Sequence, residues 1–328
     1  MKIAIVGAGI VGSTAAYYLS KEKDVEVTVF DHGPGQATKA AAGIISPWFS
    51  KRRNKAWYRM ARLGADFYQE LTSNLENDGY DTSFYDQSGV VLLKKDDGKL
   101  DGLYQYAETR LEESPIIGEL SIKNADELPK FTGFDRCLYA SGGARVEGAE
   151  LTATLIEASG FEKLEGLVTL SSLDNETYEI NAQTFDKVIL ACGAWLGQTL
   201  EPLGFEVDVR PQKGQLRDYF FEGLDTGKLP VLMPEGELDI IPFAGGKISV
   251  GASHENDKGF DLTVDEAVLE GLEEEAKIYF PGLSTAKSFS ERVGTRAYTS
   301  DFSPFFGEVP ELKNVFVASG LGSSGLTT

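Results

Sequence analysis

Cysteine and histidine are scarce in this chain of 328 residues, which contains two of each: Cys137, Cys192, His32 and His254. Two cysteines cannot build a disulfide framework, and together with two histidines they are too few for a zinc site. No apolar run approaches the roughly 20 residues that cross a bilayer, and strand-like residues begin at position 3 without a basic leader or a cleavage site. The sequence therefore predicts a cytoplasmic protein with no metal ion and no integral membrane segment.

Positive charge is also in short supply. The chain has 31 lysines and arginines against 51 acidic residues, which gives a formal net charge of −20 at neutral pH. A strongly acidic surface repels nucleic acid and anionic membranes, so we expect neither as a partner. The length and the hydrophobic content of 42% are typical of a globular protein with about two domains.

The N-terminal segment carries the most informative pattern. The apolar run from Ile3 to Val6 reads as a buried strand and leads into Gly7-Ala8-Gly9-Ile10-Val11-Gly12, after which a helical stretch, a second apolar run and Asp31 follow. In such a pattern the glycines permit a tight turn and close approach of the backbone to phosphate, while the carboxylate accepts hydrogen bonds from a ribose. The pattern predicts a dinucleotide site; a glycine-rich turn in an ordinary α/β protein is the alternative.

The remaining chain predicts both helices and strands. Apolar spacings of three and four predict helices over 54–77, 100–113, 150–159 and 265–280. Residues 85–95 read as a strand pair, 164–182 as a meander, and 207–253 as strands broken up by prolines that include Pro211 and Pro242. Apolar strands at 185–192 and 315–318 each run into small residues. Three nucleotide-binding-like segments, 3–44, 186–195 and 292–325, thus alternate with antiparallel-looking stretches, which predicts two interleaved domains.

Taken in order, these motifs resemble the D-amino-acid oxidase superfamily, and glycine oxidase and D-amino-acid dehydrogenase in particular. The motifs are the glycine turn with Asp31, the small-residue turn from Thr38 to Ile44, the strand end from Leu190 to Trp195, the run Gly294-Thr295-Arg296, and Ala318-Ser319-Gly320. The resemblance covers nearly the whole chain. It implies an α/β fold (α+β overall) in which a Rossmann-type FAD-binding domain, 1–50, 140–210 and 288–328, is interleaved with an antiparallel-sheet substrate domain, 51–139 and 211–287.

The resemblance also implies which residues hold FAD. The glycine turn would take the pyrophosphate, Asp31 the ribose, His32 would lie near the adenine, and the turn from Thr38 would wrap the diphosphate and the isoalloxazine. The last loop would face the flavin pyrimidine. The residues assigned to FAD in this way are Gly7, Ala8, Gly9, Ile10, Val11, Gly12, Asp31, His32, Thr38, Lys39, Ala41, Ala42, Gly43, Ile44, Val168, Ala191, Gly193, Trp195, Gly294, Arg296, Gly320, Leu321, Gly322, Ser323 and Ser324.

Arg296 matches the family arginine that pairs with the substrate carboxylate. It also lies about where sarcosine oxidases carry their flavin-linking cysteine, so the resemblance implies noncovalent FAD. Asp239 stands where glycine oxidase has a tyrosine, and it would either hold a substrate ammonium or lie exposed at a strand end. Ser323 and Ser324 stand in place of the second arginine of glycine oxidase. Trp48, followed by Lys51-Arg52-Arg53, would cap or charge the entrance, although a plain helix-start cluster is the alternative for these basic residues.

The implied function is an FAD-dependent oxidoreductase that oxidises the C–N bond of a D-amino acid, glycine, an N-methyl glycine or a related amine by hydride transfer to flavin. Oxygen, a quinone or another acceptor would reoxidise it, and a homo-oligomer stays open. The alternatives are a noncatalytic FAD-binding protein and an NAD-dependent dehydrogenase. The chain stops at Thr328, where the last flavin-facing helix should begin, and a helix needs about 12 residues to be more than marginal. Either the remainder is missing or the site is incompletely covered there, and in the second case we expect FAD affinity to suffer.

Overall fold

The computed structural model describes residues 1–52, 54–173 and 176–328. Its helices are α1 (Ile10–Leu19), α2 (Ala37–Ala40), α3 (Lys55–Asn77), α4 (Asp97–Glu108), α5 (Gly148–Ser159), α6 (Leu196–Leu200) and α7 (Glu266–Tyr279). The strands of the first half are β1 (Lys2–Val6), β2 (Glu26–Asp31), β3 (Ile44–Ile45), β4 (Tyr85–Asp86), β5 (Val90–Leu92), β6 (Leu120–Asn124), β7 (Arg136–Ala140), β8 (Ala144–Val146) and β9 (Glu162–Glu165). Those of the second half are β10 (Leu170–Ser172), β11 (Tyr178–Ile180), β12 (Gln183–Phe185), β13 (Lys187–Leu190), β14 (Arg210–Phe220), β15 (Val231–Met233), β16 (Asp239–Phe243), β17 (Lys247–Gly251), β18 (Ser288–Tyr298), β19 (Phe305–Glu308) and β20 (Val315–Ser319).

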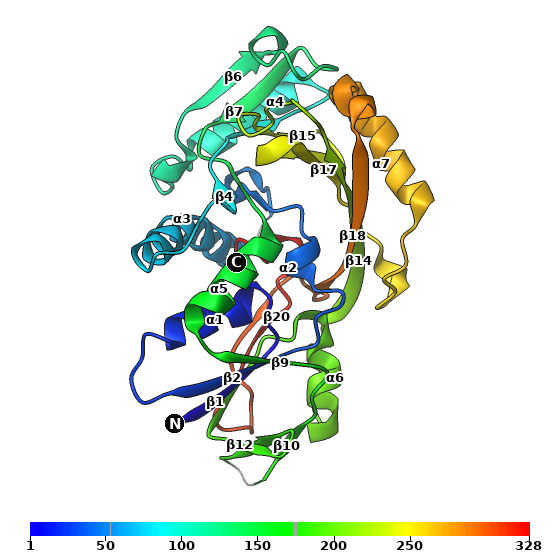
Figure 1. Ribbon diagram of the computed structural model, residues 1–328. Coiled ribbons are helices and arrows are strands. Elements are labelled where there is room, and N and C mark those ends of the chain that lie inside the picture. Colours follow the sequence, from blue (N-terminus) through cyan, green and yellow to red (C-terminus); the bar gives the residue numbers. More distant parts are fainter. Residues whose placement is uncertain (53, 174–175) are drawn as a thin grey trace.

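A six-stranded sheet in the order β19-β20-β13-β1-β2-β9 forms the lower part of the molecule in Figure 1. Its strands are parallel except for β19, which pairs antiparallel with β20 at the edge. Strands β1 and β13 are almost wholly apolar and buried, as expected for a parallel sheet that is covered on its faces. Because parallel strands end at the same edge, the glycine turn after β1 and the turns after β13 and β20 come together there.

An eight-stranded sheet in the order β18-β14-β17-β16-β15-β5-β7-β6 forms the upper part. All its pairs are antiparallel except that of β15 with β5. Helix α7 lies outside this sheet, at the right of Figure 1, and buries Leu269 and Ala276. The long strands β14 and β18 run down from this sheet toward the six-stranded sheet and so connect the two halves (Figure 1).

The predicted helices are confirmed, because their signals are local. Helix α3 begins where Asn54 accepts a hydrogen bond from the backbone N–H of Trp57, a common way of capping a helix N-terminus. Its buried residues repeat every three or four positions: Trp57, Ala61, Ala65, Tyr68, Leu71 and Leu75. The last four of these belong to an apolar cluster that also contains Trp48 and Leu100. The helix predicted over 100–113 is shifted, because α4 covers 97–108.

Two predictions about strands were wrong in detail. The first part of the expected meander is β9, which pairs with β2 in the parallel sheet, so only β10 to β12 form a meander. Pro211 and Pro242 lie inside β14 and β16 instead of breaking them. Both are tolerated because neither is flanked by paired strands on two sides: Pro211 pairs only with Ala297 of β18, and Pro242 pairs only with Ile248 of β17.

The sheets suggest one change to the predicted domain boundaries. Strand β18, which the boundary at 288 places in the FAD-binding domain, pairs along its whole length with β14 of the eight-stranded sheet. We therefore propose that the last FAD-binding segment begins after Tyr298, while the other boundaries stay predictions.

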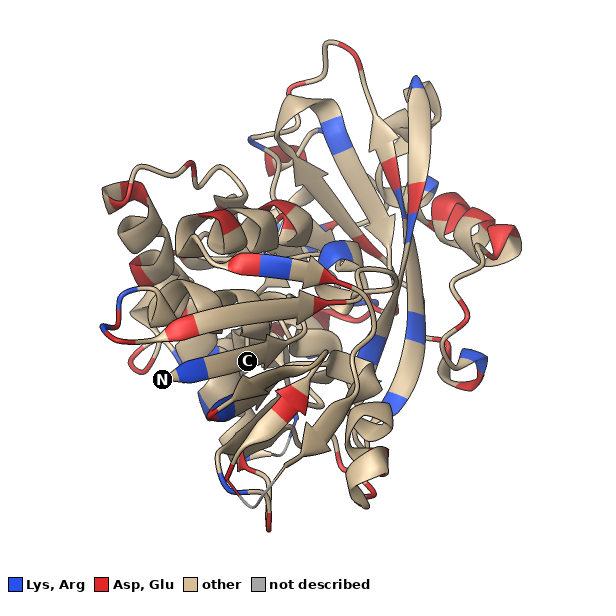
Figure 2. Ribbon diagram, turned by 60° about the horizontal axis from the view of Figure 1, so that its bottom comes forward, with Lys and Arg blue, Asp and Glu red and all other residues tan. Residues whose placement is uncertain are grey.

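Acidic residues are distributed over many elements rather than gathered in one patch, and several lie along α7 (Figure 2). Within the described ranges, no helix has the length and apolar character needed to cross a membrane.

Candidate active site

The glycine turn after β1 is built as its sequence predicts. Gly7 has a φ of 103°, a conformation that side chains other than glycine rarely adopt, and a Cβ on Gly12 would collide with the carbonyl oxygen of Gly7. Gly12 therefore allows α1 to pack directly against the end of β1. The N–H groups of Gly9 and Val11, at the start of α1, find no acceptor among the described residues. Orphan N–H groups at a helix N-terminus form a site for an anion such as a pyrophosphate.

Asp31, at the end of β2, is buried beside this turn. Its Oδ1 accepts a hydrogen bond from the backbone N–H of Ala8 at 3.0 Å and another from the side chain of Gln36. These bonds hold the carboxylate in place. Ile10 donates its N–H to the hydroxyl of Thr38 at 3.1 Å, which ties the glycine turn to α2.

A cavity of about 160 Å³, which we call the glycine-loop cavity, follows the carboxyl edge of the six-stranded sheet. It gathers residues from the glycine turn, β2, the segment after β9, the end of β13 and the last loop. The predicted cofactor residues that line it are Gly7, Gly9, Ile10, Val11, Asp31, His32, Thr38, Val168, Ala191, Gly193, Trp195, Gly320, Leu321 and Gly322. Segments far apart in sequence thus meet around one elongated cavity.

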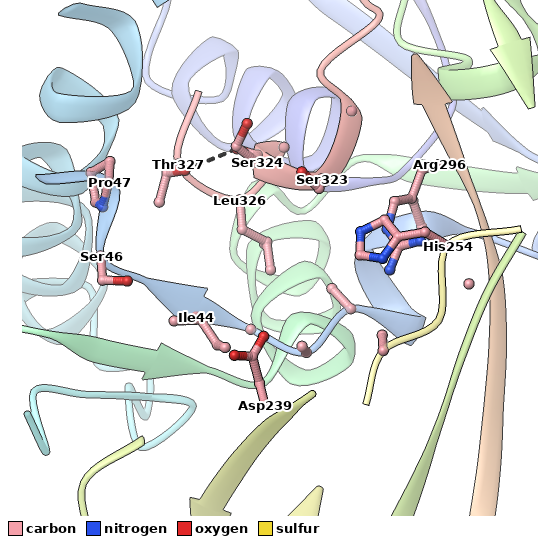
Figure 3. A pocket seen from close by; sticks show the side chains of 18 of the residues that line it. Ile44, Ser46, Pro47, Asp239, His254, Arg296, Ser323, Ser324, Leu326 and Thr327 are labelled. Atoms are coloured by element: carbon pink, nitrogen blue, oxygen red, sulfur yellow. Dashed lines mark hydrogen bonds between the residues drawn. The ribbon is translucent and has the colours of Figure 1, made fainter. Parts of the chain in front are cut away.

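A second cavity of about 360 Å³, the Arg296 cavity, lies between the last loop and the eight-stranded sheet. It shares Ala37, Thr38, Gly322 and Gly325 with the glycine-loop cavity, so the two adjoin. The predicted residues that line it are Thr38, Ala41, Ala42, Gly43, Ile44, Asp239, Gly294, Arg296, Gly322, Ser323 and Ser324. Figure 3 shows Asp239 on one side of this cavity and Ser323 and Leu326 across from it, with Arg296 and His254 at one end.

The guanidinium of Arg296 is held at one of its nitrogens and open at the others. Nη1 donates to the carbonyl of Ser253 at 2.8 Å and to Oε1 of Gln212 at 3.4 Å. Nε and Nη2 have no hydrogen-bond partner in the described part of the chain. Burial lowers the pKa of Arg296 from its usual value, which reflects loss of water around a group that still lacks an ion-pair partner within 4.0 Å. The arrangement leaves parallel N–H donors for a carboxylate.

Comparison with known proteins places the whole chain in one family. The FAD dependent oxidoreductase family, DAO, matches residues 2–328. The chain belongs to this family. It is an FAD-dependent enzyme, so the family match decides against the NAD-dependent alternative.

Two sequence relatives and one solved structure illustrate the similarity. The oxidoreductase YurR of Bacillus subtilis (strain 168), described as uncharacterized, is 38% identical over 98% of this chain and 90% of its own length. The glycine oxidase of Pseudomonas aeruginosa PAO1 is 29% identical over 99% of this chain and 90% of its own. The crystal structure of iminodiacetate oxidase from Chelativorans sp. BNC1 superposes with a TM-score of 0.94 at 30% identity, covering 99% of this chain and 91% of that one.

The residues of this FAD-dependent oxidoreductase fit its cofactor. The glycine-loop cavity offers unused N–H groups where a pyrophosphate needs them, and an anchored carboxylate, Asp31, for the ribose. The turn from Ala37 to Ile44 lies where this cavity adjoins the Arg296 cavity, and a flavin ring would fit at this junction. Gly43 shows how closely this turn packs, because its φ is 81° and an added Cβ would collide with the carbonyl of Val146.

The turn from Ala37 to Ile44, which would face the flavin, is also held by the side chain of Arg292. Its Nη1 donates to the carbonyl of Ala41 at 3.1 Å and to that of Lys39 at 3.4 Å. Its Nε and Nη2 both lie 2.9 Å from the carboxylate of Asp218, which is only 6% exposed. Arg292 thus connects the flavin-facing turn to strands β14 and β18, and we regard it as a positioning residue for that turn.

Two titratable groups of the Arg296 cavity have shifted pKa values. Burial raises the pKa of Asp239 to about 8, because protein surrounds its carboxyl group and no cation lies within 4.0 Å in the described structure. Burial and the nearby charge of Arg296 lower the pKa of His254, although Glu237, 3.7 Å from its Nδ1, acts in the opposite direction. His254 is therefore neutral at pH 7, and Asp239 is largely protonated.

Four predicted site residues line neither cavity. The entrance role of Trp48 was wrong, because its side chain has no exposed surface and lies in an apolar cluster. Ala8 and Gly12 act through the backbone, as an anchor for Asp31 and as a packing point. Lys39 contributes only its carbonyl to Arg292.

Several lining residues were not predicted. Glu237, His254 and Trp57 line the Arg296 cavity without having been predicted, and Arg52, one of the basic residues offered for the entrance, lines it as well. The sequence held a signal for Arg52, which stands in the basic run before α3, but the run itself did not distinguish a cavity position from a helix start. Arg53 of the same run lies outside the described residues.

Proposed function

We propose that this enzyme oxidises the C–N bond of a small amino acid or amine that carries a carboxylate. The observation that carries the proposal is the guanidinium of Arg296, whose unused N–H groups lie in a cavity that adjoins the FAD site. Two similar proteins support the same class, since one is a glycine oxidase and the other an iminodiacetate oxidase. Both of those names describe oxidation of small carboxylate-bearing amines.

The chain would bind such a substrate at two points. Arg296 would take the carboxylate through two parallel N–H···O bonds and so fix the α-carbon toward the flavin-facing turn. Bound FAD supplies the acceptor for a hydride from that carbon. Asp239 lies across the cavity and would receive the amine nitrogen, because a carboxyl group with a pKa of about 8 can accept a proton from a substrate ammonium near that pH.

We also propose that FAD is bound noncovalently. Within the described chain no cysteine lines the Arg296 cavity, and Cys192 is the cysteine that lines the glycine-loop cavity. Burial raises the pKa of the Cys192 thiol to about 11, so it is protonated at neutral pH and a poor nucleophile. Acid precipitation should therefore release free FAD into the supernatant. The electron acceptor and the cytoplasmic location stay predictions.

An anaerobic flavin-reduction screen tests the proposal. The purified FAD-bound enzyme is mixed with glycine, sarcosine, proline and a set of D-amino acids, and bleaching of the flavin absorbance at about 450 nm is followed. We expect bleaching by at least one of these substrates. Repeating the experiment with oxygen separates an oxidase from a dehydrogenase.

Arg296→Leu provides the matched test of the residue that carries the proposal. We expect this variant to keep FAD but to lose about 3 kcal/mol of substrate binding, the scale of a charge-assisted bidentate contact. An unchanged KM would remove Arg296 from the substrate site. A wild-type enzyme that no amino acid or amine reduces would refute the proposed reaction itself.

A further inference from the structure

The Arg296 cavity contains a second arginine without an acidic partner. Arg52 lines the cavity, and no carboxylate of the described residues lies within 4.0 Å of its side chain. Arg217 and Arg145, by contrast, are paired with carboxylates. The Arg52 residue keeps exposed surface, and partial burial of its guanidinium lowers the pKa of Arg52 from its usual value.

Aromatic rings hold this guanidinium in place. It lies 4.6 Å from the centre of the Trp57 ring and 5.7 Å from that of Phe302. Trp57 is itself anchored, since its Nε1 donates to the hydroxyl of Ser324 at 3.1 Å. A cation that is stacked on rings keeps its in-plane N–H donors available for an anion. The stacking therefore positions Arg52 without using its hydrogen bonds.

The two arginines reach the cavity from different elements, Arg52 from the segment before α3 and Arg296 from β18. Arg52 is connected through Trp57 to Ser324, and Figure 3 shows Ser324 and Thr327 separated from Arg296 by Ser323. Asp239 lies on the facing side of the cavity (Figure 3). Two arginines and two acids, Asp239 and Glu237, therefore line the same cavity.

We propose that the Arg296 cavity is built for an amine with two carboxylates, one bound by Arg296 and the other by Arg52. This inference rests on the proposed function and narrows its substrate class. The second carboxylate has two chemical sources: a substituent on the amine nitrogen, as in iminodiacetate, which is N-(carboxymethyl)glycine, or an acidic side chain, as in D-aspartate. Both would place an anion at Arg52 and leave the amine at Asp239.

Binding of unreactive acids tests the second carboxylate without turnover. Succinate and butyrate have the same number of carbons and differ by one carboxylate, and each is titrated into the FAD-bound enzyme while the flavin spectrum is recorded. We expect the ratio of the butyrate Kd to the succinate Kd to fall by about tenfold in Arg52→Gln, the effect of losing one charge-assisted contact. Lys51→Gln is the matched control, because Lys51 is an exposed neighbour that does not line the cavity, and it should keep the wild-type ratio.

Matched substrates then show where the second carboxylate lies. N-(carboxymethyl)glycine is compared with sarcosine, and D-aspartate with D-asparagine, by the KM ratio in wild type and in Arg52→Gln. A ratio that changes about tenfold in one pair supports the proposal and identifies the source. Equal Kd ratios for the two acids in wild type and Arg52→Gln would overturn it, even if the enzyme oxidises monocarboxylate amines and the proposed function stands. Arg52→Met, which removes the charge and keeps a long side chain, serves if the glutamine variant does not fold.

Discussion

Gly214 controls the position of the Arg296 guanidinium, and a single methyl group there should disable it. Gly214 lies opposite Gly294 in the pairing of β14 with β18, directly beneath the Arg296 side chain. A Cβ at Gly214 would lie 2.6 Å from Cζ and 2.7 Å from Nη2 of Arg296. Ordinary van der Waals contact requires about 3.5 Å, so the guanidinium would have to move by roughly 1 Å.

This displacement predicts a large loss of catalysis with little loss of stability. A shift of about 1 Å in a substrate-positioning group reduces activity on the order of 100-fold, or about 2.7 kcal/mol in transition-state binding. The clash involves the end of a flexible side chain, and Gly214 is not among the residues with positive φ. Alanine therefore fits the backbone, and we expect the free energy of unfolding to change by less than about 1 kcal/mol.

The assay compares three quantities for Gly214→Ala and wild type: kcat/KM with the best carboxylate substrate, the Kd for acetate from the flavin spectrum, and the Kd for FAD. We expect the first two to deteriorate and the third to stay the same. Gly271→Ala is the control, because an added Cβ in the middle of α7 meets nothing within 4 Å, and it should only stabilise the helix by about 0.5–1 kcal/mol. A kcat/KM of Gly214→Ala within about twofold of wild type would refute the reasoning.

Three further predictions concern other residues. Asp239→Asn should abolish the rise of kcat/KM that wild type shows through pH 8 as the carboxyl group ionises. Because the pKa of Asp239 is raised in the folded state, the free energy of unfolding of ligand-free wild type should fall as the pH rises from about 4 to about 8. A variant with the same Tm profile and the same pH–rate profile as wild type would contradict this. Arg292→Gln leaves Asp218 buried without its main partner and frees the carbonyl of Ala41. We therefore expect chemical denaturation to show a free energy of unfolding that is lower by roughly 3 kcal/mol, and fluorescence titration to show weaker FAD binding. An FAD affinity equal to that of wild type would argue against the positioning role of Arg292. Asp31→Asn should raise the Kd for FAD by about tenfold, the scale of one hydrogen bond to a charged group, whereas a wild-type Kd would show that the ribose is held elsewhere.

Several features of the fold were readable from the sequence because they depend on neighbouring residues. The glycine turn after β1 needs a positive φ at Gly7 and a missing side chain at Gly12, and only glycine supplies both. The capping of α3 by Asn54 and its apolar spacing are equally local. The family resemblance added the order of the distant motifs. Most of the cofactor residues that were predicted with its help line the glycine-loop cavity.

Other features depend on contacts between distant segments. Nothing near residues 288–298 shows that this strand pairs with β14 instead of joining the six-stranded sheet. Trp48 reads as an entrance residue in sequence, but packing between α3, α4 and the small strands removes it from water entirely. The hydrogen bonds of a strand and the burial of a side chain are set by whichever partner the folded chain brings alongside.

By itself, the sequence determined the dinucleotide turn and its acidic partner Asp31, since each is a residue type required by a local geometry or by a charge. The family resemblance added the arginine that would meet a carboxylate. The tertiary structure alone decided which charges share the Arg296 cavity. Arg52 comes from the segment before α3, Asp239 from β16 and Arg296 from β18, so their grouping exists only after both sheets have formed. Substrate preference depends on that grouping, because the energy of an ionic contact is set by distance and by the exclusion of water.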